Sequence, residues 1–191
     1  IYKRLQAKHS DLQEGGQFLV EGHYIAADDA AAGNLYNNAS WRPVEISGGG
    51  SSWEMSLSGQ TQREDPAIRA WKYYDSSVQL TDHYLQQDGL VIVGVRTTSN
   101  GDGTWDYEYA IQNHCSERAI RTFVVPISPG STVTNIDFHD VDYHSGEPFD
   151  GTDWASTVTS DSIQWSTATY EVNPDANALR WGTLYNFSFT C

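Results

Sequence analysis

Residues 138–154, FHDVDYHSGEPFDGTDW, bring together two histidines, five carboxylate side chains and four aromatic rings. Side chains alternate between the two faces of a strand, so a strand over residues 132–141 puts alternate acidic and imidazole groups of this segment on one side. Carboxylate oxygens are the ligands that Ca²⁺ prefers, and an added imidazole admits Zn²⁺ or another transition metal. The segment therefore predicts a metal site, with Ca²⁺ as its candidate ion. The predicted ligands are Asp140, Asp142, His144 and Glu147.

The same segment also has a purely structural interpretation, in which its carboxylates cap backbone N–H groups. The residues DGTD at 150–153 have the composition of an ordinary turn. The array does not match an EF-hand loop, because Gly146 stands one place late and the closing Glu is missing. A metal-dependent hydrolase centred here is a further hypothesis, but strand parity places His139 opposite Asp140. The sequence leaves these alternatives open.

Aromatic residues suggest a second kind of site. The chain has seven Trp and eleven Tyr, and aromatic rings can stack on sugar rings while acidic side chains bind sugar hydroxyls. The predicted ligand-binding residues are Trp154 and Trp181, which lie near predicted loops or strand ends. The alternative is that large aromatics fill the core, as we expect for Trp105.

The elements that must position these residues are strands, because alternation with a period of two dominates the chain. The clearest unit is a hairpin: residues 90–98 are almost continuously apolar, which predicts burial on both faces, and residues 104–113 alternate. Two short helices are expected at 26–32 and 67–71. Further strands are expected at 18–25, 41–46, 53–62, 78–85, 121–127, 132–141, 162–166 and 184–190. About ten short strands predict an all-β, antiparallel β-sandwich, immunoglobulin-like or jelly-roll, and we expect one domain over residues 1–191.

Composition limits the partners. A net charge of −14 argues against nucleic acid and against an anionic membrane surface, because binding phosphates requires basic residues. No stretch is long and apolar enough to predict a membrane span. The acidic, Lys-poor composition favours an exported bacterial protein, secreted or on the cell surface. The chain begins at Ile1, so we expect that a leader or a longer upstream region precedes it.

Two cysteines, Cys115 and Cys191, predict a disulfide in an oxidising compartment. Each continues the parity of an aromatic strand face, which supports the pairing. Such a bond would contribute about 4 kcal/mol through the entropy of the unfolded chain. The alternative is two buried thiols.

Several blocks resemble a group of uncharacterised exported bacterial proteins. They include VEGHYIAADDAAAGNLYNNASWR, TNIDFHDVDYHSGEPFDGTDW and NALRWGTLYNFSF, within a resemblance that spans about residues 5–189. In that group the blocks lie near the C-terminal end of a longer precursor. The resemblance implies export and a sandwich fold, and it implies no activity. The two cysteines depart from the pattern of the group.

Three functions are consistent with these observations. The first is a non-catalytic structural or adhesive extracellular module, self-associating into a filament or matrix through strand addition at a sheet edge. The second is a carbohydrate-binding module that binds polysaccharide with the help of Ca²⁺. The third is the hydrolase described above.

Overall fold

The protein is all-β, as the sequence predicts. The computed structural model describes residues 10–13, 15–50, 52–141 and 147–191, and in these residues it contains eleven strands and two short helices. No helix of these residues is long and apolar enough to cross a membrane. The chain divides into two compact units, Ile1–Ala70 and Trp71–Cys191. The single-domain expectation stays a prediction.

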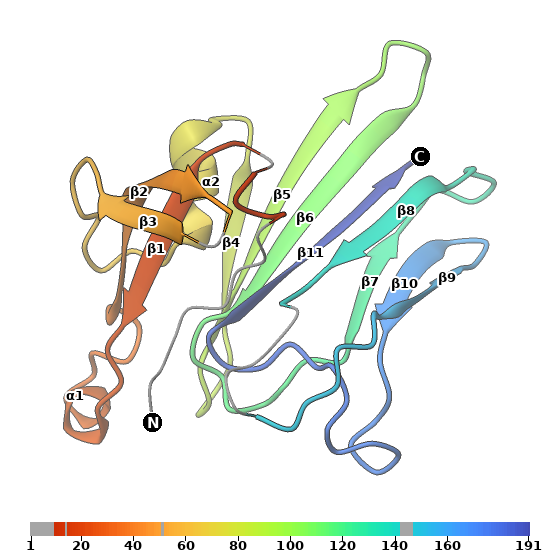
Figure 1. Cartoon of the computed structure of the whole chain (residues 1–191). Coiled ribbons are helices and arrows are strands. Elements are labelled where there is room, and N and C mark those ends of the chain that lie inside the picture. Colours follow the sequence, from red (N-terminus) through yellow and green to blue (C-terminus); the bar gives the residue numbers. More distant parts are fainter. Residues whose placement is uncertain (1–9, 14, 51, 142–146) are drawn as a thin grey trace. The chain divides into compact units, whose positions relative to one another are not determined.

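The first unit contains a three-stranded antiparallel sheet, in the order β1–β2–β3 (Figure 1). Its strands are β1 (Phe18–His23), β2 (Ala39–Gly49) and β3 (Ser52–Leu57), and α1 (Ala27–Ala31) lies between β1 and β2. Trp41 of β2 is fully buried, and its indole N–H donates to the Asp65 carboxylate at 3.0 Å. The hydrogen bond satisfies the one polar atom of this large side chain, so its burial costs little.

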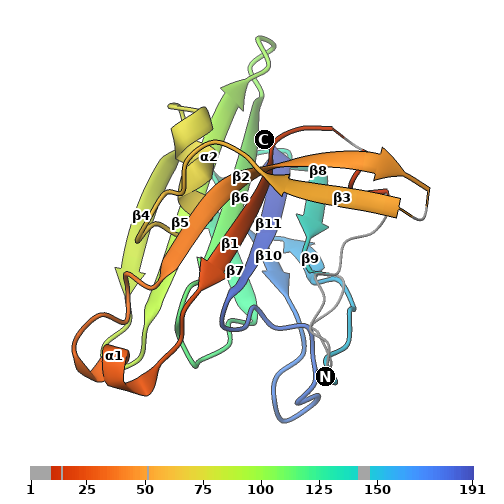
Figure 2. The same ribbon diagram turned by 60° about the vertical axis from the view of Figure 1, so that its left-hand side comes forward.

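The second unit is a β-sandwich. One sheet has five strands in the order β4–β5–β6–β11–β8, and the other has three in the order β7–β10–β9. Figures 1 and 2 show both sheets. The helix α2 (Ile68–Tyr74) precedes them in the chain. The strands are β4 (Gln79–Tyr84), β5 (Leu90–Ser99), β6 (Trp105–Asn113), β7 (Thr122–Pro126), β8 (Thr134–His139), β9 (Ala155–Val158), β10 (Ser162–Ser166) and β11 (Thr183–Thr190).

Aromatic rings from both sheets fill the space between them. Phe187 of β11 is 2% exposed, and its ring centroid lies 4.9 Å from that of Phe123 on β7 and 5.4 Å from that of Trp165 on β10. Phe138 of β8 also belongs to the cluster, and its ring centroid lies 5.3 Å from that of Phe187. Tilted and edge-on contacts of this kind stabilise a core beyond the area that they bury.

The strand β5 is buried on both faces at its start, as its apolar run predicts. Leu90, Val91 and Ile92 are all buried. On the face away from the aromatic core, a Cβ atom added at Gly94 would lie 3.1 Å from the rings of Trp71 and the side chain of Leu80. The absence of a side chain at position 94 therefore allows α2 to pack closely on the sheet.

Two expectations about this unit are wrong. Trp105 is 44% exposed, because it begins β6 beyond the end of the core. Cys115 and Cys191 are free thiols. Cys191 pairs through its backbone with Trp105 at one end of β6, whereas Cys115 follows the other end. At 3.4 Å per residue the two cysteines lie roughly 30 Å apart, well beyond the reach of a disulfide.

Candidate functional site

The segment predicted to bind metal leaves the sandwich at the end of β8, and its first carboxylate has a structural partner. The Asp140 carboxylate accepts a hydrogen bond from the Asn177 amide, which also donates to the Thr152 carbonyl at 3.0 Å. The Tyr185 hydroxyl donates to Asn177 Oδ1 at 2.6 Å. Burial, aided by the nearby Asp140 charge, raises the pKa of Tyr185. Asp140 thus joins a network that fixes the loop to the core.

The turn predicted at residues 150–153 is present. The Asp150 carboxylate accepts from the backbone N–H of Thr152 at 3.1 Å and from the Asn173 amide at 2.6 Å. The backbone hydrogen bond from Thr152 is the main reason that the pKa of Asp150 lies below its ordinary value. These contacts match the structural interpretation, in which the carboxylates cap the loop's own backbone.

The remaining predicted metal ligands are only partly described. Glu147 lies on an exposed stretch, whereas Asp142 and His144 fall outside the described residues. Among the residues that the structure describes, no three His, Cys, Asp or Glu side chains gather closely enough to hold a metal ion. The four-ligand site, and Ca²⁺ as its ion, stay predictions.

The two predicted ligand-binding tryptophans differ in position. Trp154 is 3% exposed, stacks on Phe138 with 5.7 Å between ring centroids, and donates its indole N–H to the Asn177 carbonyl. Its ring is part of the core, so it offers no face to a sugar. Trp181 is half-buried in the turn before β11.

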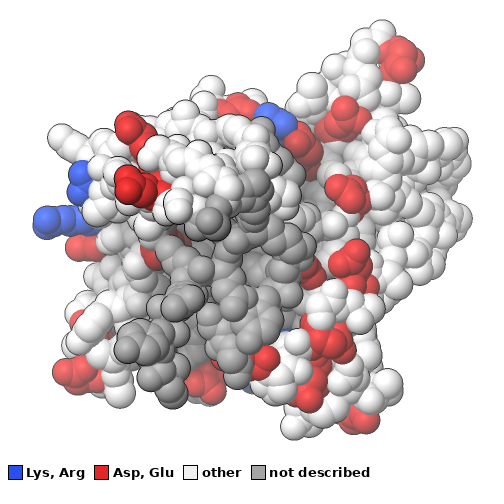
Figure 3. Space-filling model, viewed as in Figure 1, with Lys and Arg blue, Asp and Glu red and all other residues white. Residues whose placement is uncertain are grey.

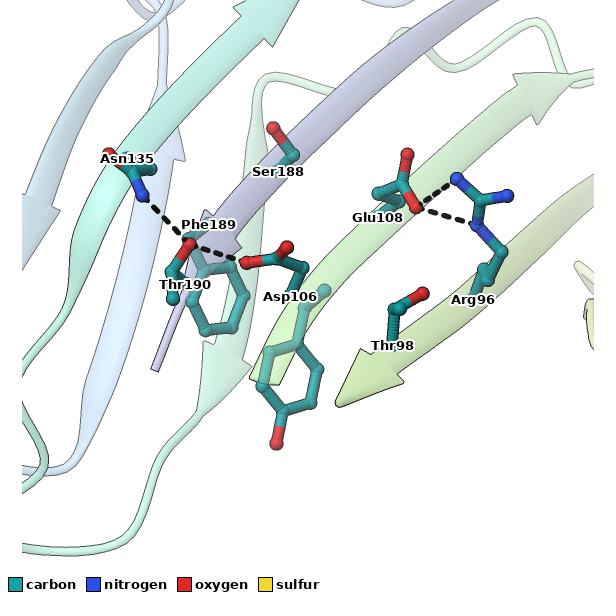
Figure 4. A pocket seen from close by; sticks show the side chains of 9 residues that line it. Arg96, Thr98, Asp106, Glu108, Asn135, Ser188, Phe189 and Thr190 are labelled. Atoms are coloured by element: carbon teal, nitrogen blue, oxygen red, sulfur yellow. Dashed lines mark hydrogen bonds and ion pairs between the residues drawn. The ribbon is translucent and has the colours of Figure 1, made fainter. Parts of the chain in front are cut away.

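A hollow of about 380 Å³ lies elsewhere, on the five-stranded sheet. We call it the polar groove, and Figure 4 shows its side chains. Its lining residues are Arg96, Thr98, Asp106, Tyr107, Glu108, Asn135, Ser188, Phe189 and Thr190. They come from β5, β6, β11 and β8. Such a volume is within the range of small-molecule sites in proteins.

Strand register explains why these polar groups meet. Glu108 of β6 pairs with Arg96 on one side and with Ser188 on the other. In the next row Asp106 pairs with Thr98 and with Thr190. Directly paired residues share a face, and residues two apart along a strand do too. The polar side chains therefore point away from the aromatic core, while the rings of Tyr107 and Phe189, stacked at 4.9 Å, belong to the core side.

Asp106 is held in its ionised form. One of its oxygens, Oδ1, accepts from the Thr190 hydroxyl at 2.6 Å and from the Asn100 amide at 3.0 Å. These two hydrogen bonds, the Thr190 bond first, lower the pKa of Asp106 below its ordinary value. Both bonds use the same oxygen, so the second carboxylate oxygen can accept a hydrogen bond from a ligand.

An ion-pair network occupies the other end of the groove. Arg96 Nε donates to Glu108 Oε2 at 2.6 Å, and its Nη2 approaches the same oxygen. Arg96 Nη1 donates to Asp75 at 3.1 Å. These carboxylates, Glu108 first, raise the pKa of Arg96. The guanidinium charge is therefore already neutralised, and among the described residues that line the groove there is no other cation to bind an anionic group.

The surface charge, like the charge of the groove, is mainly negative. Figure 3 shows many acidic side chains and few basic ones on the visible face. The groove combines carboxylate acceptors, hydroxyls and an amide, which together suit a neutral ligand with several hydroxyl groups. The sequence alone does not reveal the groove, because Asp106 and Glu108 look like ordinary solvated carboxylates on an alternating strand. Only the pairing of β6 with β5 and β11 reveals the cluster.

Comparison of the chain with known protein families, with curated proteins and with solved structures gives no match. The resemblance to exported bacterial proteins therefore stays a prediction, and the candidate site depends on its own geometry.

Proposed function

We propose that the chain is a non-catalytic extracellular module that adheres by binding carbohydrate in the polar groove. The observation that carries the proposal is the hydrogen-bonding pattern of the groove. Asp106 and Glu108 each use a single oxygen for contacts within the protein. The two residues stand about 7 Å apart along the strand, and their second oxygens can accept from two sugar hydroxyls.

The charge of the groove favours a neutral sugar over an acidic one. Arg96 is paired with two carboxylates, Glu108 and Asp75. An anionic polysaccharide would meet Asp106 without a compensating cation, in a chain of net charge −14. A neutral polysaccharide has hydroxyl donors for the carboxylates and is not repelled by their negative charge. Hydrogen bonding, rather than stacking on Trp154, is the proposed mode of recognition.

Adhesion through a bound glycan needs no reaction, and it is the form of the adhesive hypothesis that the groove supports. Assembly into a filament stays a separate prediction.

Affinity gel electrophoresis tests the proposal. The protein migrates through gels that contain xylan, β-glucan, galactomannan or, as an anionic comparison, alginate. We expect retardation by at least one neutral polysaccharide and none by alginate. Ser188→Phe, which fills the groove from β11, is expected to weaken the binding at least tenfold, since each lost hydrogen bond is worth about 1 kcal/mol.

The matched control is Asn186→Phe. Asn186 is exposed on the same strand and the same face, two residues away, but it does not line the groove. It should leave the retardation unchanged. The proposal fails if no neutral polysaccharide retards the wild-type protein, or if Ser188→Phe binds as well as Asn186→Phe.

A further inference from the structure

We propose that Asn135 determines which sugar the polar groove accepts, by reading the configuration of one ring hydroxyl with its side-chain amide. The inference rests on the proposed function, because it concerns the same groove. Three observations on β8 and its neighbours carry it.

The first observation is the backbone at Asn135. Its φ is +50°, in the left-handed region that L residues rarely adopt. Asparagine tolerates this conformation better than most side chains, but it still costs about 1 kcal/mol. Glycine would adopt it without cost, so the conformation alone does not explain an asparagine.

The second observation is a β-bulge at the same place. The register of β8 against β11 shifts between Ser188 and Thr190: Thr190 pairs with Thr134, and Ser188 pairs with Asp137. β8 therefore uses one residue more than β11 over this stretch. A bulge changes the direction of a side chain on an edge strand. Here the Asn135 side chain lines the groove and points toward Thr190 (Figure 4).

The third observation is a hydrogen-bonded relay that fixes the amide. Thr190 has a single hydroxyl proton, which it donates to the Asp106 carboxylate at 2.6 Å. The Thr190 oxygen then accepts from Asn135 Nδ2 at 3.1 Å. An ionised carboxylate only accepts hydrogen bonds, so the donor of each hydrogen bond in this relay is known. The Asn135 amide must therefore direct its NH₂ group toward Thr190.

The oriented amide has functional groups left for a ligand. One N–H is used on Thr190, so the second N–H and the carbonyl oxygen of the exposed Asn135 side chain can face a bound molecule. A sugar hydroxyl both donates and accepts, and it matches this pair. An epimer that points the same hydroxyl away leaves the amide without a partner, and sites built on such hydrogen bonds reject such ligands strongly.

Asn135→Gly separates sugar recognition by the amide from a purely structural role of this residue at the β-bulge. The variant keeps the left-handed backbone and removes the amide. We expect its melting temperature to equal or exceed that of the wild type, while its affinity falls at least tenfold and its preference between epimers is lost. The probes are neutral gluco-, manno-, galacto- and xylo-oligosaccharides, which include epimeric pairs, in isothermal titration calorimetry.

A second variant and a control make the outcome decisive. Asn135→Asp keeps a side chain that tolerates the backbone but replaces the N–H donors by a charge, and it is expected to lose affinity as well. If Asn135→Gly binds and discriminates like the wild type while Ser188→Phe does not bind, the groove is the site and the role of Asn135 is overturned. If the wild type binds no oligosaccharide of the panel, both proposals fall.

Discussion

At the scale of single residues, Asp106 is the group whose environment is most informative. It lies on a strand surface, yet it accepts hydrogen bonds from Thr190 and Asn100, and it is the point at which the relay from Asn135 ends. A carboxylate fixed in this way keeps its charge and its direction without a ligand. This preorganisation lowers the entropic cost of binding.

The relay makes a prediction about titration. Removing the Thr190 hydroxyl in Thr190→Val should raise the pKa of Asp106 toward its ordinary value of 3.8, because the Thr190 bond is the main cause of the lowered pKa. A lowered pKa in the folded state stabilises the protein above 3.8, and this stabilisation is lost as pH falls through the folded-state pKa. The NMR chemical shift of the Asp106 carboxyl carbon, followed from about pH 2 to about pH 6, measures this pKa in the wild type and in the variant. An unchanged Asp106 titration in the variant would contradict the relay.

Single residues also show how much of the candidate site could be predicted from the sequence. The alternation of β6 correctly indicates that Asp106 and Glu108 share a face, but it cannot show that Arg96 and Ser188 flank them, because strand pairing is non-local. The parity of Cys115 and Cys191 was informative about faces in the same way. It did not show that the two cysteines lie at opposite ends of β6, so the prediction of a disulfide was wrong.

At the scale of elements, the strands follow closely from their patterns. Residues 90–98 predict a strand buried on both faces, and β5 is buried in this way only in its first part, where the aromatic core lies on one side and Trp71 packs near Gly94 on the other. Thr97 and Thr98 at its far end are exposed. The strand that the sequence missed is β9 (Ala155–Val158). All four of its residues are exposed, so no burial on one face imposes an alternation that could be recognised.

The turn before β5 depends on a close approach between backbones. Gly89 stands beside the loop after β6, and a Cβ atom there would lie 2.3 Å from the carbonyl oxygen of Cys115. Asp88 binds the same loop, since its carboxylate accepts from the Ser116 hydroxyl at 2.6 Å and from the Glu117 N–H at 3.0 Å. The obstruction is backbone, which cannot rotate away as a side chain can.

Gly89→Ala is therefore expected to lower the free energy of unfolding by about 1–3 kcal/mol, the usual cost of forcing atoms into a packed site. Chemical denaturation measures it. The matched control is Gly22→Ala on β1, also a glycine without positive φ, where an added Cβ meets nothing within 4 Å. Equal stability of the two variants would show that the loop after β6 can shift to admit the methyl group.

At the scale of the whole molecule, the principal hydrophobic cluster lies in one part of the chain. The aromatic and aliphatic residues of the principal cluster all lie between Leu85 and Cys191, in the second unit. The sequence predicted a single domain, because every segment has the same β pattern and no linker stands out. A shared pattern shows the fold class of each segment, but it does not show which segments share a core.

A truncated chain tests the single-domain expectation. Residues 65–191 keep α2 whole and contain the principal core cluster, so we expect them to fold without residues 1–64. The fragment should unfold in one cooperative thermal transition, since small domains with their own core usually do. It should also keep the near-ultraviolet circular dichroism of the buried Trp154 and Trp165, which free rotation would abolish. A fragment with strand content but without this signal would instead indicate that the sandwich needs residues 1–64 to pack, and the chain would then be one domain.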